Sequence, residues 1–342
     1  MVPWLVIASD APGLGRGVRG QTLTWFLRTY FGRRRVRRRA VREHLARPLA
    51  AETAFVGFPS SLTPERLAEI DARRIVAFDY LDSHDLAWTE PQQQALRGRV
   101  RLYLKPWFEP AWRHPVAMGL LPVRRYLRFT AALLASRCLP RSASPASRQY
   151  DVAFLGRPNA TQFFRDGSIA SIDQRLAWIL EIKRQAPDLK FGGGLVEGDP
   201  LQRRRLEERY GPLDDVWSGD KANYASYHRL LQQSRVLLAP GGNVPWTYRH
   251  YECLYSGAVV VSLDYRRRDM LIPLPRDAMV HVPDDAAVLP AVRQALEWSA
   301  QRPEIARQAF DHLQQYLWWG AYARSRPRVL ARFLDQLDAA GP

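Results

Sequence analysis

The feature that most constrains the fold is an alternation of short apolar segments with stretches of helical periodicity, which starts again after residue 150. The first half contains four short apolar segments. Stretches whose apolar residues have helical spacing, such as Gln21–Phe31, lie between them. These segments predict strands at Trp4–Ala8, Ala54–Phe58, Arg74–Phe78 and Arg101–Leu104. Strands that alternate with helices indicate βαβ units and therefore a parallel sheet.

The second half repeats this pattern after a candidate linker, residues 139–149, which reads LPRSASPASRQ. It predicts strands at Asp151–Leu155, Leu189–Gly192, Val236–Ala239, Ala258–Ser262 and Met279–Val282. It also predicts helices at Gln174–Gln185, Tyr224–Gln233, Tyr248–Ser256 and from Pro290 onward, with bends near Pro303 and Gly320. A chain of 342 residues exceeds the usual size of one core, so we expect two Rossmann-like α/β domains, residues 1–138 and 150–315.

One segment of the second half has the pattern of a phosphate site. The predicted strand Val236–Ala239 ends in Pro240-Gly241-Gly242-Asn243, and a new helix starts near Thr247. Ligands of open α/β sheets bind beyond the carboxyl ends of strands, and helix N-termini attract anions. The pattern therefore predicts a diphosphate pocket, in which Glu252 could accept hydrogen bonds from two ribose hydroxyls. The alternative is an ordinary glycine turn followed by a solvated or salt-bridged glutamate.

This segment resembles the nucleotide-sugar-binding region of GT-B glycosyltransferases, especially the exostosin-like and family-1/4-like groups. The resemblance rests on the E-x4-G pattern of Glu252–Gly257 followed by the apolar run Ala258–Val261, and on the likeness of Tyr150–Arg157 to that domain's first strand. It implies a GT-B fold, with two Rossmann-like domains whose parallel sheets face each other across a cleft. It also implies that residues 316–342 form helices that pack back on the N-terminal domain.

The resemblance also implies roles for individual residues. Glu252 would bind the ribose, while Gly241, Gly242 and Asn243 with Arg249 would face the diphosphate or the donor sugar. Gly156 and Arg157 would lie beside the pyrophosphate, where an arginine can neutralise the departing nucleoside diphosphate without a metal. We therefore expect no metal and no cofactor, with the nucleoside diphosphate sugar as donor substrate. Val244 stands where retaining members often carry a second glutamate, so the stereochemical outcome stays open.

The N-terminal half carries the acceptor side in such enzymes. Gly13 and Gly15 follow the first predicted strand, in a loop expected at the interdomain cleft. An inverting transferase needs a base that takes the proton of the acceptor hydroxyl. The candidates follow the third predicted strand, and they are Asp79, Asp82, His84 and Asp85. The alternative is an acidic loop that caps the next helix.

A basic run extends the first predicted helix and contains Arg33, Arg34, Arg35, Arg37, Arg38 and Arg39. Together with a formal net charge of +16, it favours anionic partners. Such a run could hold an anionic membrane surface, contact nucleic acid phosphates, or form a solvated helix or loop. No signal peptide or membrane-spanning apolar run is evident, so we expect a cytoplasmic protein, with peripheral binding at the inner membrane face as an open alternative.

The sequence thus predicts transfer of a sugar from a nucleoside diphosphate donor to a hydroxyl of a glycan, lipid-linked or other anionic acceptor. One alternative is a DNA-modifying glycosyltransferase that acts on hydroxylated bases. Another is a nucleotide-sugar-binding module without catalysis. The two cysteines, Cys138 and Cys253, have no metal or redox spacing and are expected to be reduced, buried thiols.

Overall fold

A computed structural model describes residues 147–158, 174–196, 200–218, 224–241, 248–264, 275–283 and 286–317. In the first half it describes residues 5–8, 34, 36–39, 46–47, 54–57, 65, 74–78, 91, 94 and 100–104. The chain divides into two compact units, Met1–Thr130 with Asp269–Pro273 and Gln315–Pro342, and Ala131–Arg268 with Leu274–Gln314. The domain boundaries expected from the sequence, the facing of the two sheets and the packing of the terminal helices stay predictions.

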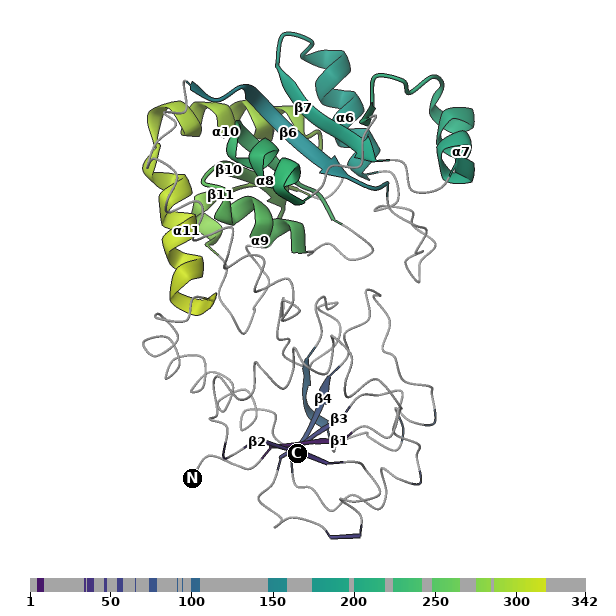
Figure 1. Ribbon diagram of the computed structural model, residues 1–342, viewed down its shortest axis with the longest axis vertical. Helices are drawn as coiled ribbons and strands as arrows, with labels where there is room; N and C mark the ends of the chain where they lie inside the picture. The colour runs from purple at the N-terminus through teal and green to yellow at the C-terminus, as the bar shows by residue number, and fades with distance from the viewer. Residues whose placement is uncertain are drawn as a thin grey trace. The chain divides into compact units, whose positions relative to one another are not determined.

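The first unit contains a five-stranded parallel sheet in the order β2-β1-β3-β4-β5 (Figure 1). Its strands are β1 (Leu5–Ala8), β2 (Val36–Arg39), β3 (Ala54–Gly57), β4 (Arg74–Phe78) and β5 (Val100–Leu104). Four of them fall where the apolar segments predicted them. The order is that of a flavodoxin-like doubly wound sheet, which confirms the predicted parallel sheet of this half.

Strand β2 corrects one prediction, because the basic run was expected to extend a helix. Val36–Arg39 instead pairs in parallel with Leu5–Ala8. It is an edge strand, and charged residues on an edge discourage pairing with a further strand. The prediction that the basic run continues the first helix is therefore wrong for Val36–Arg39.

The second unit contains a six-stranded parallel sheet in the order β11-β10-β9-β6-β7-β8. Its strands are β6 (Tyr150–Gly156), β7 (Phe191–Val196), β8 (Trp217–Ser218), β9 (Ser234–Ala239), β10 (Val259–Leu263) and β11 (Met279–Val282). This is the Rossmann order, in which the chain first adds strands on one side of β6 and then crosses to the other side at β9. The topological switch point therefore lies between β6 and β9.

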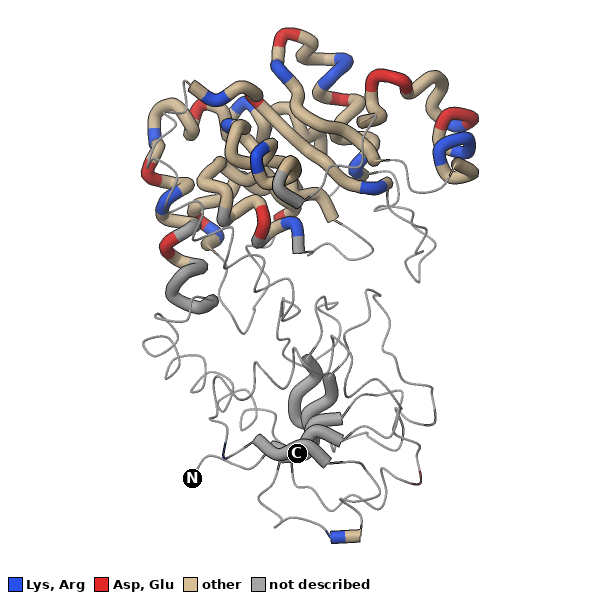
Figure 2. The backbone as a smooth tube through the Cα atoms, in the orientation of Figure 1, with Lys and Arg blue, Asp and Glu red and all other residues tan. Residues whose placement is uncertain are grey.

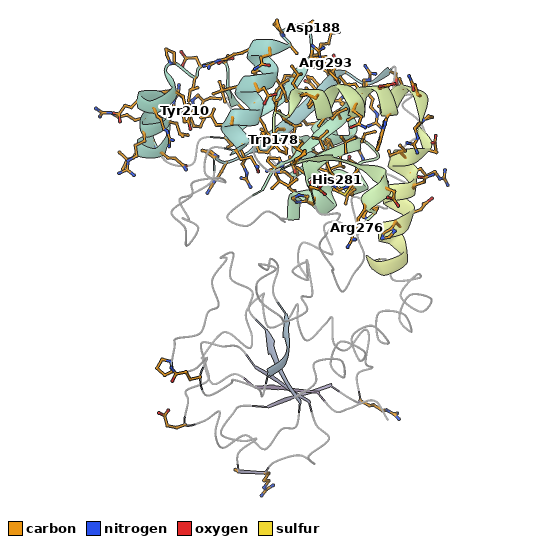
Figure 3. All side chains as sticks on the ribbon, turned by 180° about the vertical axis from the view of Figure 1, so that it is seen from behind. Trp178, Asp188, Tyr210, Arg276, His281 and Arg293 are labelled. Atoms are coloured by element: carbon orange, nitrogen blue, oxygen red, sulfur yellow. The ribbon has the colours of Figure 1, made fainter. Side chains whose placement is uncertain are left out.

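The helices that alternate with and follow these strands are α6 (Gln174–Gln185), α7 (Pro200–Tyr210), α8 (Tyr224–Gln232), α9 (Tyr248–Tyr255), α10 (Leu289–Gln301) and α11 (Glu304–Leu317), with the 3₁₀ turn η3 (Arg276–Ala278). Helices α6, α8, α9 and α10 contact strands of the sheet (Figure 1). Helices α6 and α10 contact each other, α8 contacts β6 and β9, and α9 contacts β9 and β10. Every residue of β10 is buried, as expected for a parallel strand covered on both faces. Trp178 of α6, labelled in Figure 3, is 5 % exposed and belongs to the same core.

Two features of this unit differ from the sequence prediction. The sequence predicted a strand that ends at Gly192, but β7 continues through Gly193 and Gly194 to Val196. A Cβ atom on Gly193 would lie 2.3 Å from the carbonyl oxygen of Phe154, so glycine lets β7 approach β6 closely. The pattern also missed α7, because Leu206 is the one residue of that helix that is buried and the rest carries no apolar stripe.

Helix α7 carries pairs of opposite charges four residues apart. Arginine and glutamate residues lie side by side along it (Figure 2), with Arg203 bonded to Glu207 and Arg204 bonded to Glu208. The predicted break near Pro303 is confirmed, because α10 ends at Gln301 and α11 begins at Glu304. Of the helices in the described part of the chain, none is long and apolar enough to cross a membrane.

We predict that Gly193→Ala lowers the free energy of unfolding by about 3 kcal/mol or more, because Cβ meets backbone that cannot yield. Gly211→Ala is the matched control. Gly211 has the same left-handed φ, +81° against +80°, but nothing lies within 4 Å of its Cβ position. Gly211→Ala should lower the free energy of unfolding by only about 1 kcal/mol. Urea unfolding measures both values, and equal costs would contradict the close approach of β7 to β6.

Candidate functional site

The candidate site lies at the carboxyl ends of β6 and β9, on the two sides of the switch point. Strand β6 ends at Gly156 and is followed by the exposed Arg157. Strand β9 ends at Ala239 and is followed by Pro240 and Gly241, which are both buried. Open α/β sheets bind their ligands at this position, because the connections diverge there and leave a crevice.

Arg249 enters the site from the first turn of α9. Its guanidinium lies 4.3 Å from the centre of the Phe154 ring, and Nη1 donates a hydrogen bond to the carbonyl oxygen of Leu155 at 2.6 Å. A Cβ atom on Gly156 would lie 2.1 Å from Nη2, so only glycine leaves room for this arginine. Its Nε is buried and has no hydrogen-bond partner in the described part of the chain.

Arg175 enters the same site from the first turn of α6. Its guanidinium lies 5.9 Å from the centre of the Phe154 ring. Its Nε donates to the carbonyl oxygen of Gly241 at 2.9 Å, and Nη1 donates to that of Arg157 at 2.7 Å. Arg175 therefore bridges the two strand ends. Burial and the charge of Arg249 lower the pKa of Arg175, while Tyr227 acts in the opposite direction.

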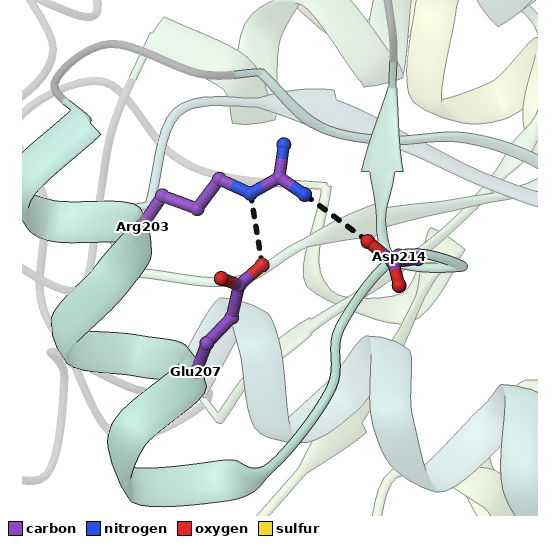
Figure 4. Close-up of polar contacts among 3 residues, drawn as sticks. All are labelled: Arg203, Glu207 and Asp214. Carbon is purple, nitrogen blue, oxygen red and sulfur yellow. Dashed lines mark hydrogen bonds and ion pairs between the residues drawn. The ribbon is translucent and has the colours of Figure 1, made fainter.

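Neither arginine has an acidic partner. Elsewhere in this unit, Arg203 bonds Glu207 at 2.8 Å and Asp214 at 3.1 Å (Figure 4). For Arg175 and Arg249, by contrast, no carboxylate of the described residues lies within 4.0 Å. Both also stand in the first turn of a helix without an acidic residue there, where the helix dipole disfavours a cation. The site therefore has a local excess of positive charge.

Glu252 lies beside this pair on α9 and is 8 % exposed. The hydroxyl of Tyr227, from α8, donates to Glu252 Oε2 at 2.7 Å. The same hydroxyl accepts a longer hydrogen bond from Arg249 Nη1, at 3.5 Å. Burial raises the pKa of Tyr227 well above its ordinary value; Arg249 acts against this shift and Glu252 adds to it. The phenol therefore keeps its proton and remains a donor.

The end of α9 is fixed by a glycine and an arginine. Gly257 has a φ of +76°, as expected for a residue that ends a helix in the left-handed conformation. Its carbonyl oxygen accepts a hydrogen bond from Arg148 Nη2 at 2.7 Å, and Arg148 Nη1 donates to the carbonyl oxygen of Ser234 at 2.5 Å. Arg148 thus ties the residues before β6 to the helix that carries Arg249 and Glu252.

The structure brings together four of the residues singled out by the sequence: Gly156, Gly241, Arg249 and Glu252. Arg157 is beside them, but its side chain is exposed and its carbonyl makes the local contact. The backbone N–H of Gly241 donates to Gln174 Oε1 at 2.9 Å, so it serves the contact with α6. The donor-binding roles of these residues stay predictions.

The remaining candidates fall largely outside the described residues. That holds for Gly242, Asn243, Gly13, Gly15, Asp79, Asp82, His84, Asp85, Arg33 and Arg35. Arg34 is an exposed turn residue, and Arg37, Arg38 and Arg39 are described by their strand backbone.

Sequence reasoning missed Arg175, Tyr227, Gln174 and Phe154. A signal existed for Arg175, because an arginine in the first turn of a predicted helix opposes the helix dipole. No comparable signal existed for Tyr227. It reaches Glu252 across 25 residues, from a helix whose apolar pattern explains its presence equally well.

No family model matches the sequence, and no curated protein matches it. Among solved structures, the chain is similar to an α,α-trehalose 6-phosphate synthase from Burkholderia multivorans, with 10 % identity over 95 % of this chain and 80 % of that chain and a TM-score of 0.48. It is also similar to sucrose-phosphate synthase from Thermosynechococcus elongatus, with 14 % identity, 88 % and 77 % coverage and a TM-score of 0.48. AviGT4, a glycosyltransferase involved in avilamycin A biosynthesis, matches with 13 % identity, 99 % coverage of both chains and a TM-score of 0.44. These similar structures are GT-B glycosyltransferases.

We predict that Cys253, the neighbour of Glu252, is chemically inert in the folded protein. It is 1 % exposed, as the sequence predicted, and burial raises its pKa to about 12. In a Cys138→Ser variant, iodoacetamide at pH 8 should leave the native protein unlabelled over a time that labels it fully in urea. Labelling at the rate of the unfolded chain would show that α9 does not seal this residue.

Proposed function

We propose that this chain is a glycosyltransferase that moves a sugar from a nucleoside diphosphate donor to an acceptor hydroxyl, without an essential metal. The observation that carries the proposal is the pair of arginines, Arg175 and Arg249, that both lie over the ring of Phe154 and have no carboxylate of the described residues within 4.0 Å. Two cations held close together in a partly buried place require a counterion. A bound diphosphate supplies that charge.

The chemistry of guanidinium suits this ligand. Each guanidinium presents several N–H donors in a plane and can hold two phosphate oxygens at once. Both residues are half-buried, which leaves part of each exposed to solvent. As the bond to the sugar breaks, negative charge grows on the departing diphosphate, and two fixed guanidiniums would stabilise it there. This is the reason to propose that the reaction needs no metal.

Glu252 extends the site from the phosphates to the nucleoside. It follows Arg249 by three residues on α9, so both lie on one face of that helix. A carboxylate is a strong acceptor for two neighbouring hydroxyls, as a ribose offers. Arg175, Arg249 and Glu252 would thus follow the order of groups in a nucleoside diphosphate.

We place the acceptor in the first unit. The base that takes the proton of the acceptor hydroxyl would be one of Asp79, Asp82, His84 and Asp85, which come directly after β4. The net charge of +16 favours an anionic glycan or lipid-linked acceptor.

We predict that one of the ribonucleoside diphosphates UDP, GDP, ADP and CDP, or dTDP, raises the melting temperature of the protein. At 100 times its dissociation constant it should stabilise the fold by about 2.7 kcal/mol, and EDTA should leave the shift unchanged. Arg249→Gln should abolish the shift. Arg204→Gln is the matched control, because it removes an arginine whose partner is Glu208 on the surface, and it should keep the shift. A cooperative melt that none of the five nucleotides moves would overturn the proposal.

We predict that Gly156→Ala weakens nucleotide binding but leaves the stability of the fold nearly unchanged. The added methyl group would lie 2.1 Å from Nη2 of Arg249 and 3.3 Å from the edge of the Phe154 ring. The end of the arginine side chain can move away, so the melting temperature of the free protein should change little. The displaced guanidinium should weaken nucleotide binding about tenfold, measured by calorimetry. Unchanged affinity would show that the position of Arg249 against Phe154 does not matter for the ligand.

A further inference from the structure

Arg249 and Glu252 stand at a spacing that normally produces an ion pair. Opposite charges three or four residues apart on a helix attract each other. In this chain Arg203–Glu207, Arg204–Glu208 and Arg307–Asp311 form such pairs, at 2.8, 3.0 and 3.5 Å. Arg249 and Glu252 do not approach within 4.0 Å. The hydroxyl of Tyr227 contacts both of them instead.

We propose that Tyr227 is a positioning residue that keeps Arg249 and Glu252 from neutralising each other. This inference rests on the proposed function, since it explains how a site for an anion keeps its positive charge beside a carboxylate. Tyr227 comes from α8, so its place does not depend on the helix that carries the two charged residues.

The hydrogen bonds around Tyr227 have a fixed direction. A guanidinium only donates, so the Tyr227 oxygen accepts from Arg249 Nη1 at 3.5 Å. The single hydroxyl proton is then given to Glu252 Oε2, at 2.7 Å. The oxygen atom therefore contacts both charged groups and offers each of them a partner. Burial raises the pKa of Tyr227, so the hydroxyl keeps the proton that it donates to Glu252.

Removal of the hydroxyl changes the partners that are available. In Tyr227→Phe, Glu252 loses a donor and Arg249 loses an acceptor, and both are attached to the same face of α9. Their spacing on the helix then favours a direct contact between Arg249 and Glu252. An anion must then compete with the protein's own carboxylate for Arg249.

The test uses inorganic pyrophosphate, which probes the arginines without a ribose or a base. We expect Tyr227→Phe to weaken pyrophosphate binding about fivefold, as measured by calorimetry. We expect Tyr227→Phe with Glu252→Gln to bind it as tightly as Glu252→Gln alone, because a neutral amide cannot form the competing ion pair. A merely structural role of the hydroxyl would not be rescued by a second substitution. Tyr150→Phe, at the opposite end of β6, is the control and should bind like the wild type.

The outcomes separate the two proposals. No pyrophosphate binding by the wild type would overturn the anion site, and with it this inference. Binding by the wild type with an unchanged affinity in Tyr227→Phe, or a loss that Glu252→Gln does not rescue, would overturn only the role of Tyr227. If Tyr227→Phe alone does not fold, the comparison of the double variant with Glu252→Gln still decides, since a weaker double variant would contradict the inference.

Discussion

The rest of the site depends on one constraint, the placement of two guanidinium groups against the ring of Phe154 at a topological switch point. Arg175 and Arg249 reach this ring from the first turns of different helices, and their hydrogen bonds go to backbone carbonyls. Phe154 is 1 % exposed and cannot shift, because β7 packs on its carbonyl through Gly193. The fold thus concentrates positive charge where parallel sheets bind ligands.

Several residues have the task of keeping this charge in place. Gly156 leaves space for Arg249, and Arg148 holds the end of α9 through Gly257. The proposed role of Tyr227 belongs to the same group, since it would prevent the protein from supplying its own counterion. These residues need not touch a ligand. In the proposed function they would determine whether the residues that touch the ligand are charged and separated.

The sequence predicted the parts of this structure that depend on local pattern. Alternating apolar runs located most strands of both sheets, and Gly257 marked the end of α9. The sequence-based prediction was wrong where contacts between distant parts of the chain determine the local structure. The glycines of β7 looked like a strand end, although they permit close packing of strands, and the arginines of β2 looked helical, although they lie on a sheet edge. Arg175 was missed because its place in the site depends on Arg249, 74 residues away in the sequence. The strand order of the sheet brings the two residues close together.

The central claim is that Arg175 and Arg249 are kept without an acidic partner in order to hold the diphosphate of a nucleotide. A crystal structure of the complex with the best-binding nucleoside diphosphate tests it most directly. The account predicts phosphate oxygens within about 3.2 Å of both guanidinium groups, with the ribose hydroxyls on the Glu252 carboxylate. A protein carboxylate closing on the two arginines, with the nucleotide bound elsewhere, would contradict it.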